Sequence, residues 1–203
     1  VYKRQPLGWL LARRKLPGSV FVSALVTLPM VLPPTVLGYY LLIVLGKQGP
    51  IGRLLYDCLG VNLVFTRPAA VLAAAVIAFP LMARSAQAGF EAVDTNLEEV
   101  ARTLGKTETA VFFGVTLPLA RRGVLAGAVL AFARSMGEFG ATLMVAGNIP
   151  GQTQTLPIAV YDAVQAGNYA LANTLVLTTS GLALLCLLMM ARITSAGASD
   201  VKS

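Results

Sequence analysis

Residue types that commonly carry catalysis or bind metals are scarce in this chain. It has no histidine and two cysteines, Cys58 and Cys186, which lie far apart in the sequence. Zinc, haem and iron–sulfur centres are built mainly from histidine and cysteine ligands, so we expect no metal site and no cofactor bound by this chain. Arg134 and Glu138 are ionisable residues within a long apolar segment, but they do not form a pair of a nucleophile and a general base. We therefore expect no catalytic residue, and an intramembrane enzyme ranks last among the alternatives.

The elements that must position these residues are predicted to be membrane-spanning helices. Of the 203 residues, 56% are hydrophobic and 12% are charged, whereas about 25% of residues are charged in soluble domains. A helix needs about 20 mostly apolar residues to cross the hydrocarbon layer. The sequence therefore predicts an all-α, polytopic transmembrane helical bundle that forms a single domain over residues 1–203. The expected spans are residues 19–46, 68–90, 123–146 and 169–191, and residues 7–15 are interpreted as the remnant of a first span in an N-terminally truncated chain.

The expected first complete span contains Pro29, Pro33 and Pro34. Proline removes a backbone donor, and lipid cannot satisfy the carbonyl that is freed. Two interpretations remain open, a packing kink within one span or a broken helix that lines a pathway.

The basic residues predict how the chain lies in the membrane. Ten fall on one side of the expected spans and three on the other, and the side with more lysine and arginine is cytoplasmic in most membrane proteins. The ten are Arg13, Arg14, Lys15, Arg84, Arg102, Lys106, Arg121, Arg122, Arg192 and Lys202, and the three are Lys47, Arg53 and Arg67. Residues 91–118 and the C-terminus are then cytoplasmic, and residues 47–67 and 147–168 face outward. Because topology explains the net charge of +7, we expect membrane lipid and no nucleic acid as a partner.

Both outward segments are expected to contain a short helix. IGRLLYDCLG places Ile51, Leu54, Leu55 and Cys58 at helical spacing, and Pro157 stands near the start of a second pattern, TLPIAVYDAVQ. Cys186 falls near the inner end of the last span, so a disulfide with Cys58 is excluded by the short reach of that bond.

The 91–118 segment has its own helical pattern. Leu97, Val100, Ala101 and Leu104 recur at i, i+3, i+4 and i+7, which predicts a short amphipathic helix. Thr95 and Glu98 fit a capping box at its start, and Gly105 fits the left-handed residue that ends a helix. From amphipathicity alone the apolar stripe packs either on the helices of this chain or on a partner.

Fixed spacing in this segment resembles a known signature. Glu99, Val100, Ala101, Gly105, Val115, Leu117 and Pro118 are similar to the EAA signature, E-A-A-x3-G-x9-I-x-L-P, of the cytoplasmic loop in bacterial ABC importer permeases, and they depart from it at Val100 and Val115. The resemblance implies a coupling helix that docks on an ATP-hydrolysing subunit. The chain lacks a G-x-x-x-x-G-K-[ST] run, so ATP is expected to be used by that partner subunit. The ATPase-coupling residues that we expect are Glu91, Leu97, Glu99, Val100, Ala101, Leu104, Gly105, Leu117 and Pro118.

Three further stretches narrow the resemblance. PMVLPPTVLGYYLL, GPIGRLLYDCLG and AFARSMGEFGATLMVAGNIPGQTQTLPIAVY are similar to molybdate permeases of the ModB type, and sulfate permeases share the GEFG element. The resemblance implies a type I ABC importer permease in the bacterial inner membrane, working as a homodimer with two ABC ATPase subunits and an external molybdate-binding protein. Transport would be oxyanion import by alternating access. Sulfate or thiosulfate import is the first alternative, and an ATPase-independent secondary transporter or channel is the second.

Arg134 and Glu138 lie four residues apart within the expected third span. Charges inside a membrane are costly and are normally paired or wetted. They form either an internal ion pair or part of an anion pathway or gate with Ser135, Gly137 and Gly140.

Overall fold

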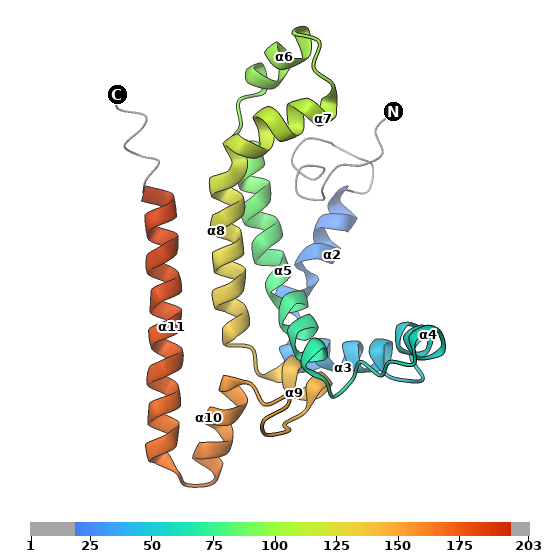
Figure 1. Cartoon of the computed structure of the whole chain (residues 1–203), viewed down its shortest axis with the longest axis vertical. Coiled ribbons are helices and arrows are strands. Elements are labelled where there is room, and N and C mark those ends of the chain that lie inside the picture. The colour runs from blue at the N-terminus through green and yellow to red at the C-terminus, as the bar shows by residue number, and fades with distance from the viewer. Residues whose placement is uncertain (1–18, 196–203) are drawn as a thin grey trace. The chain divides into compact units, whose positions relative to one another are not determined.

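The computed structural model describes residues 19–195, and within that range it contains helices and no strand (Figure 1). This confirms the predicted all-α class. The elements are α2 (Ser19–Val31), α3 (Pro34–Leu45), α4 (Pro50–Leu59), α5 (Arg67–Glu91), α6 (Thr95–Thr103), α7 (Glu108–Val111), the π-helix η1 (Phe112–Thr116), α8 (Leu117–Met136), α9 (Gly140–Ala146), α10 (Leu156–Gln165) and α11 (Tyr169–Ser195). The expected span remnant at residues 7–15 lies outside the described residues.

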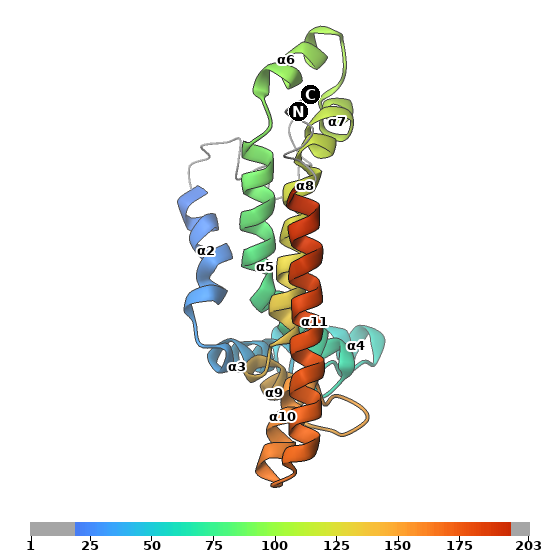
Figure 2. The same cartoon turned by 90° about the vertical axis from the view of Figure 1, so that its left-hand side faces the viewer.

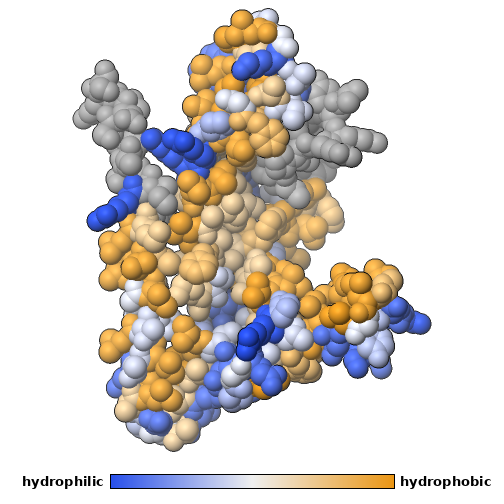
Figure 3. All heavy atoms as spheres, viewed as in Figure 1, coloured by the Kyte–Doolittle hydropathy of each residue, from blue (hydrophilic) through white to orange (hydrophobic). Residues whose placement is uncertain are grey.

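Three helical stretches of the described residues are long and apolar enough to cross a membrane by themselves. They are Arg67–Glu91, Glu108–Met136 and Tyr169–Met189. The first and third coincide with the expected spans at residues 68–90 and 169–191. Figure 2 shows α11 as one unbroken helix, and Figure 3 shows that hydrophobic side chains cover much of the visible surface of these helices.

The expected span at residues 19–46 is two helices in the structure, so of the two interpretations left open the structure favours a broken helix over a kink within one helix. α2 and α3 meet at an angle of 113° around residues 32 and 33. Pro33 has extended backbone angles, φ −56° and ψ 137°, directly before Pro34 at the start of α3. A residue that precedes proline is disfavoured in the α conformation, so the Pro33–Pro34 pair ends one helix and starts the next.

The expected span at residues 123–146 does not coincide with one helix of the structure. The long helical stretch begins at Glu108 and ends at Met136, and α9 begins only at Gly140. Phe139 leaves the helical conformation with φ −123° and ψ −57°. The Glu138 carboxylate accepts a hydrogen bond from the Ala141 backbone N–H at 3.0 Å, so a side chain replaces a backbone carbonyl at the start of α9.

The chain divides into two compact units. The described part of the first unit comprises residues 19–26, 80–131 and 187–195. Its core contains Ala86, Phe90, Val93, Phe112 and Ala120. Within it α5 and α8 approach closely, because a Cβ on Gly123 would lie 2.6 Å from the Gly89 Cα. Small residues allow such backbone contact between membrane helices.

The second unit comprises residues 27–79 and 132–186. Its core residues are Leu37, Leu45, Val64, Ala69, Ala70, Ala73, Ile77, Ala141, Val145 and Ala146. α3 packs on α9 at Gly38, where an added Cβ would lie 2.8 Å from both the Ala141 Cα and the Met144 Cβ. The two short helices expected in residues 47–67 and 147–168 are present as α4 and α10.

Candidate functional site

Helix α6 is held at its N-terminus by a side-chain cap. The Asp94 Oδ1 atom accepts a hydrogen bond from the Asn96 backbone N–H at 2.9 Å. Thr95 is the first residue of the helix, so the expected capping box of Thr95 and Glu98 is wrong. Aspartate is as good an N-cap as threonine or better, and the Glu98 side chain is occupied elsewhere.

The C-terminus of α6 is closed by Gly105, which has the predicted left-handed conformation with φ +78°. The Gly105 N–H donates to the Arg102 carbonyl at 2.9 Å, and the Lys106 N–H donates to the Ala101 carbonyl at 3.2 Å. This pair of bonds is the Schellman arrangement. A Cβ at Gly105 would meet no atom within 4 Å, so glycine is required here by backbone conformation and not by space.

One side of α6 is buried within the first unit and carries a carboxylate. Glu98 is 2% exposed and Thr116 is 1% exposed, and the Thr116 hydroxyl donates to the Glu98 Oε1 atom at 2.8 Å. Sequence reasoning missed this role for Glu98. Its spacing from Ala101 places the two residues on one face of the helix, which is the signal that could have shown that Glu98 faces inward.

Arg102 joins this carboxylate to α7. Its Nη2 atom lies 3.5 Å from the Glu98 Oε2 atom, and its Nε atom lies 2.7 Å from the Glu108 Oε1 atom. The hydrogen bond to Glu108 is the main cause that raises the pKa of Arg102 above its ordinary value. Burial, the next cause in size, lowers this pKa, and the charges of Glu108 and Glu98 raise it. Arg102 therefore stays charged between two carboxylates.

The other side of α6 is apolar and exposed. Leu97 is 49%, Val100 56% and Leu104 75% exposed, whereas Ala101 is 6% exposed. The apolar stripe of α6, by which we mean Leu97, Val100 and Leu104, is thus largely uncovered by the described residues. Two interpretations of the stripe were left open. Burial of Ala101 fits packing on the helices of this chain, whereas exposure of Leu97, Val100 and Leu104 favours packing on a partner.

The other residues expected to take part in coupling fall into two groups. Glu91, Glu99 and Pro118 are exposed, and the Glu91 carboxylate accepts a hydrogen bond from Gln87 at 2.8 Å. Leu117 packs against the core of the first unit. The 91–118 segment therefore combines a buried attachment with an exposed apolar stripe.

A second cluster of polar residues lies at the α8–α9 break within the second unit. The Arg134 Nη1 atom is 3.2 Å from the Glu138 Oε2 atom, so the predicted ion pair is present in the structure. Glu138 is 2% exposed, and its other oxygen binds the start of α9. The pair thus links the last turn of α8 to the first turn of α9.

The three remaining residues of the expected pathway differ in their surroundings. The Ser135 hydroxyl donates to the Phe132 carbonyl at 2.7 Å. Gly137 is exposed. A Cβ at Gly140 would lie 3.1 Å from the Thr35 Cγ2 atom, so α9 packs tightly on the start of α3 at this residue. The structure therefore brings Arg134 and Glu138 together and places Gly140 against the start of α3.

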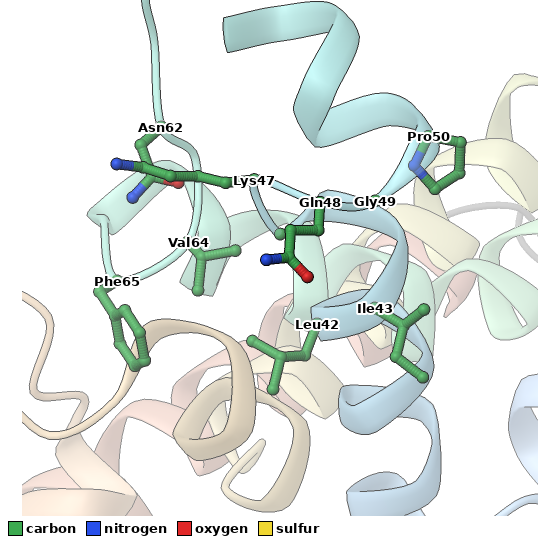
Figure 4. A pocket seen from close by; sticks show the side chains of 10 residues that line it. Leu42, Ile43, Lys47, Gln48, Gly49, Pro50, Asn62, Val64 and Phe65 are labelled. Carbon is green, nitrogen blue, oxygen red and sulfur yellow. The ribbon is translucent and has the colours of Figure 1, made fainter.

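The second unit also contains an open hollow of about 700 Å³ between the end of α3 and residues 62–65. Lys47 and Asn62 both line it, as do Leu42 and Ile43 on α3 (Figure 4). The Lys47 Nζ atom also lies 5.1 Å from the centre of the Tyr56 ring. The residues expected from the sequence to form a site do not line this hollow.

The long apolar helices define a multi-pass membrane protein, and its polar 91–118 segment exposes an apolar stripe. Residues 5–196 match the family of binding-protein-dependent transport system inner membrane components, and the chain belongs to that family. It is a transport subunit and not an enzyme, because the relatives that it matches are transport permeases.

Three comparisons describe the relatives. The chain is 48% identical to the molybdenum transport system permease protein ModB of Escherichia coli K12, over 90% of this chain and 80% of that protein. It is 38% identical to sulfate permease 2, chloroplastic, of Chlamydomonas reinhardtii, over 94% of this chain and 51% of that protein. Among solved structures, an inward-facing MetNI methionine ABC transporter aligns with a TM-score of 0.68 and 22% identity, over 94% of this chain and 84% of that chain. The last comparison shows a shared fold, that of a type I ABC importer permease.

Proposed function

We propose that this chain is the permease subunit of an ATP-driven oxyanion importer that carries molybdate across the bacterial inner membrane. The molybdenum permeases of Escherichia coli and Haemophilus influenzae, each 48% identical to it, support this choice of anion. Sulfate is the second candidate, and the sulfate permease that is 38% identical supports it.

The apolar stripe of α6 is the single observation on which the coupling proposal depends. Three large apolar side chains, Leu97, Val100 and Leu104, are about half to three-quarters exposed on a helix fixed at both ends. We assign this stripe to a groove on a separate ATPase subunit. Arg84, Arg102, Lys106, Arg121 and Arg122 support a cytoplasmic location for the segment, since basic residues accumulate on that side.

The assembly that we propose contains two copies of this chain, two ATPase subunits and an external molybdate-binding protein. ATP binding closes the ATPase subunits, the two docked α6 helices move with them, and the bundle passes between inward-open and outward-open states. Such a shift is limited to the difference in binding free energy between the two states.

The Arg134–Glu138 cluster is the proposed part of the anion pathway or gate, together with Ser135, Gly137 and Gly140. The Arg134 side chain is 40% exposed while its carboxylate partner is buried, so the guanidinium keeps donors available and its charge is partly neutralised. Weak, transient hydrogen bonds allow an anion to leave again, which a fixed high-affinity site would prevent.

The test of the function is reconstitution of the full complex in proteoliposomes. We expect molybdate, delivered by the binding protein, to stimulate ATP hydrolysis and to accumulate inside, with sulfate giving a much smaller response. Stimulation by sulfate alone would replace molybdate with sulfate as the substrate. Uptake by proteoliposomes that contain only this chain would refute the need for an ATPase.

The docking role of α6 is tested with Leu104→Ala. A buried leucine contributes about 1.5–3 kcal/mol, so loss of most of this side chain is expected to weaken binding of the ATPase subunit about tenfold. Leu125→Ala on α8 is the control, because Leu125 is likewise an exposed leucine, at 50% against 75% for Leu104, but lies outside the 91–118 segment. Equal ATPase affinity in the two variants would contradict docking at the stripe.

A further inference from the structure

The Glu98–Thr116 hydrogen bond joins α6 to the start of α8 within the first unit. The two residues are 18 positions apart in the chain. η1 ends at Thr116 and α8 begins at the next residue, Leu117, without leaving helical backbone angles. A displacement of Thr116 is therefore a displacement of the first turn of α8.

The chain itself offers a less direct route between the two helices. From the end of α6 it passes through Gly105, where an added Cβ would meet no atom within 4 Å. It then continues through α7 and the π-helix η1. Short π-helical stretches are rare and often occur at functional sites. The buried Glu98–Thr116 hydrogen bond instead joins α6 directly to the start of α8.

Burial makes the Glu98–Thr116 bond both directional and hard to replace. Glu98 and Thr116 are almost fully inaccessible, so water cannot readily take the place of either partner. A hydrogen bond to a charged group is stronger than a neutral one, and a low local dielectric strengthens it further. Arg102, which also holds Glu108, keeps the Glu98 carboxylate oriented.

We propose that Glu98 and Thr116, oriented by Arg102, are positioning residues that pass the movement of the docked α6 to α8. This role rests on the proposed function, because it requires α6 to be moved by an ATPase subunit. It differs from the role of the apolar stripe of α6, which contacts the partner, since Glu98 and Thr116 face the interior of this chain.

The experiment uses the whole complex of permease, ATPase and binding protein in proteoliposomes, and it measures molybdate taken up per ATP hydrolysed. Thr116→Val keeps the shape of the side chain and removes its donor, and we expect uptake per ATP to fall at least about fivefold. Thr116→Ser restores the donor and is expected to stay within about twofold of the wild-type ratio. Thr103→Val is the matched control, because Thr103 is an exposed threonine of α6 that bonds only its own helix, at the Val100 carbonyl.

A second variant tests the acceptor. Glu98→Gln keeps an oxygen for the Thr116 hydroxyl but removes the negative charge beside Arg102, so its ratio is expected to lie between those of the wild type and Thr116→Val. A lower ratio for Glu98→Gln than for Thr116→Val would overturn the role of the hydrogen bond.

The other outcomes also decide the proposal. If the wild-type complex shows no molybdate-stimulated ATP hydrolysis, the proposed function fails. If the wild-type complex couples and Thr116→Val couples equally well, the transmission role fails while the function stands. If Thr116→Val no longer assembles with the ATPase whereas Thr103→Val does, the bond maintains the fold, and the transmission role is again refuted.

Discussion

Gly105 determines where α6 ends and how its last turn is held. Its φ of +78° lies in the left-handed region, which costs an L-residue roughly 1–2 kcal/mol. Proline is excluded altogether, because its ring fixes φ near −65°. Proline would also remove the N–H that donates to the Arg102 carbonyl. The apolar stripe ends at Leu104, the residue before this turn, so a change in the backbone conformation of Gly105 would displace the stripe.

We expect Gly105→Pro to abolish molybdate uptake by the reconstituted complex without lowering the amount of permease inserted in the membrane. Insertion depends on the long apolar helices, and Gly105 lies outside them. The measurements are uptake in proteoliposomes and the quantity of membrane-inserted chain.

Gly60→Pro provides the control for this change. Gly60 also has a left-handed conformation, with φ +67°, and it also donates its N–H to the last turn of a helix, at the Tyr56 carbonyl of α4. Because α4 has no part in the proposed coupling, this variant is expected to retain most of its uptake. Normal ATP-driven uptake by Gly105→Pro would refute the coupling role of the turn.

The structural role of Gly105 can be predicted from the sequence, whereas that of Glu98 cannot. The end of α6 at Gly105 was predictable, because it depends on spacing and on a backbone preference of one residue. The burial of Glu98 was not, because it depends on Thr116, which lies 18 residues further along the chain. Local pattern favoured a capping role for Glu98 beside Thr95, whereas the structure gives the cap to Asp94.

Among the helices of the second unit, α3 and α9 pack closely against one another at Gly38. Gly38 lies against α9, and a Cβ there would come within 2.8 Å of the Ala141 Cα and the Met144 Cβ. Since Ala141 is fully buried, its backbone cannot move away without opening the core around it. The helices are therefore expected to separate if any side chain is added at Gly38.

Gly38→Ala is expected to destabilise the protein by about 1–3 kcal/mol, the usual cost of overpacking a core. Gly181→Ala in α11 is the matched control, because an added Cβ there meets no atom within 4 Å. That change replaces a flexible helical residue with alanine and is expected to be neutral or stabilising by up to about 1 kcal/mol. Thermal unfolding in detergent compares them, and equal midpoints would contradict the close contact.

The helices were predicted more reliably than the breaks between them. α5 and α11 follow from long uninterrupted apolar runs. The bend of 113° between α2 and α3 is indicated in the sequence by a proline pair, and such a pair is also compatible with a kink in one helix. The break after Met136 depends on the Glu138 carboxylate accepting a hydrogen bond from the Ala141 N–H. The four-residue spacing of Arg134 and Glu138 predicted an ion pair but not this contact.

Coupling through α6 requires that each segment of the chain lies on a particular side of the membrane. Leu97, Val100 and Leu104 reach an ATPase subunit only if the 91–118 segment is cytoplasmic, and α4 must then be outside. Basic residues support this orientation through their distribution. The two native cysteines make it measurable, because Cys58 is exposed on α4 and Cys186 is buried in α11.

We expect a membrane-impermeant maleimide to label Cys58 from outside the inner membrane and to leave Cys186 unlabelled unless the protein is unfolded. In a Cys58→Ser background, Val100→Cys is expected to react only after the inner membrane is opened, because Val100 is exposed on α6. Cys186 then serves as the internal measure of folding in both proteins. Labelling of Val100→Cys from outside would place α6 away from any ATP-hydrolysing partner, and coupling through its apolar stripe would be untenable even if the complex transported molybdate.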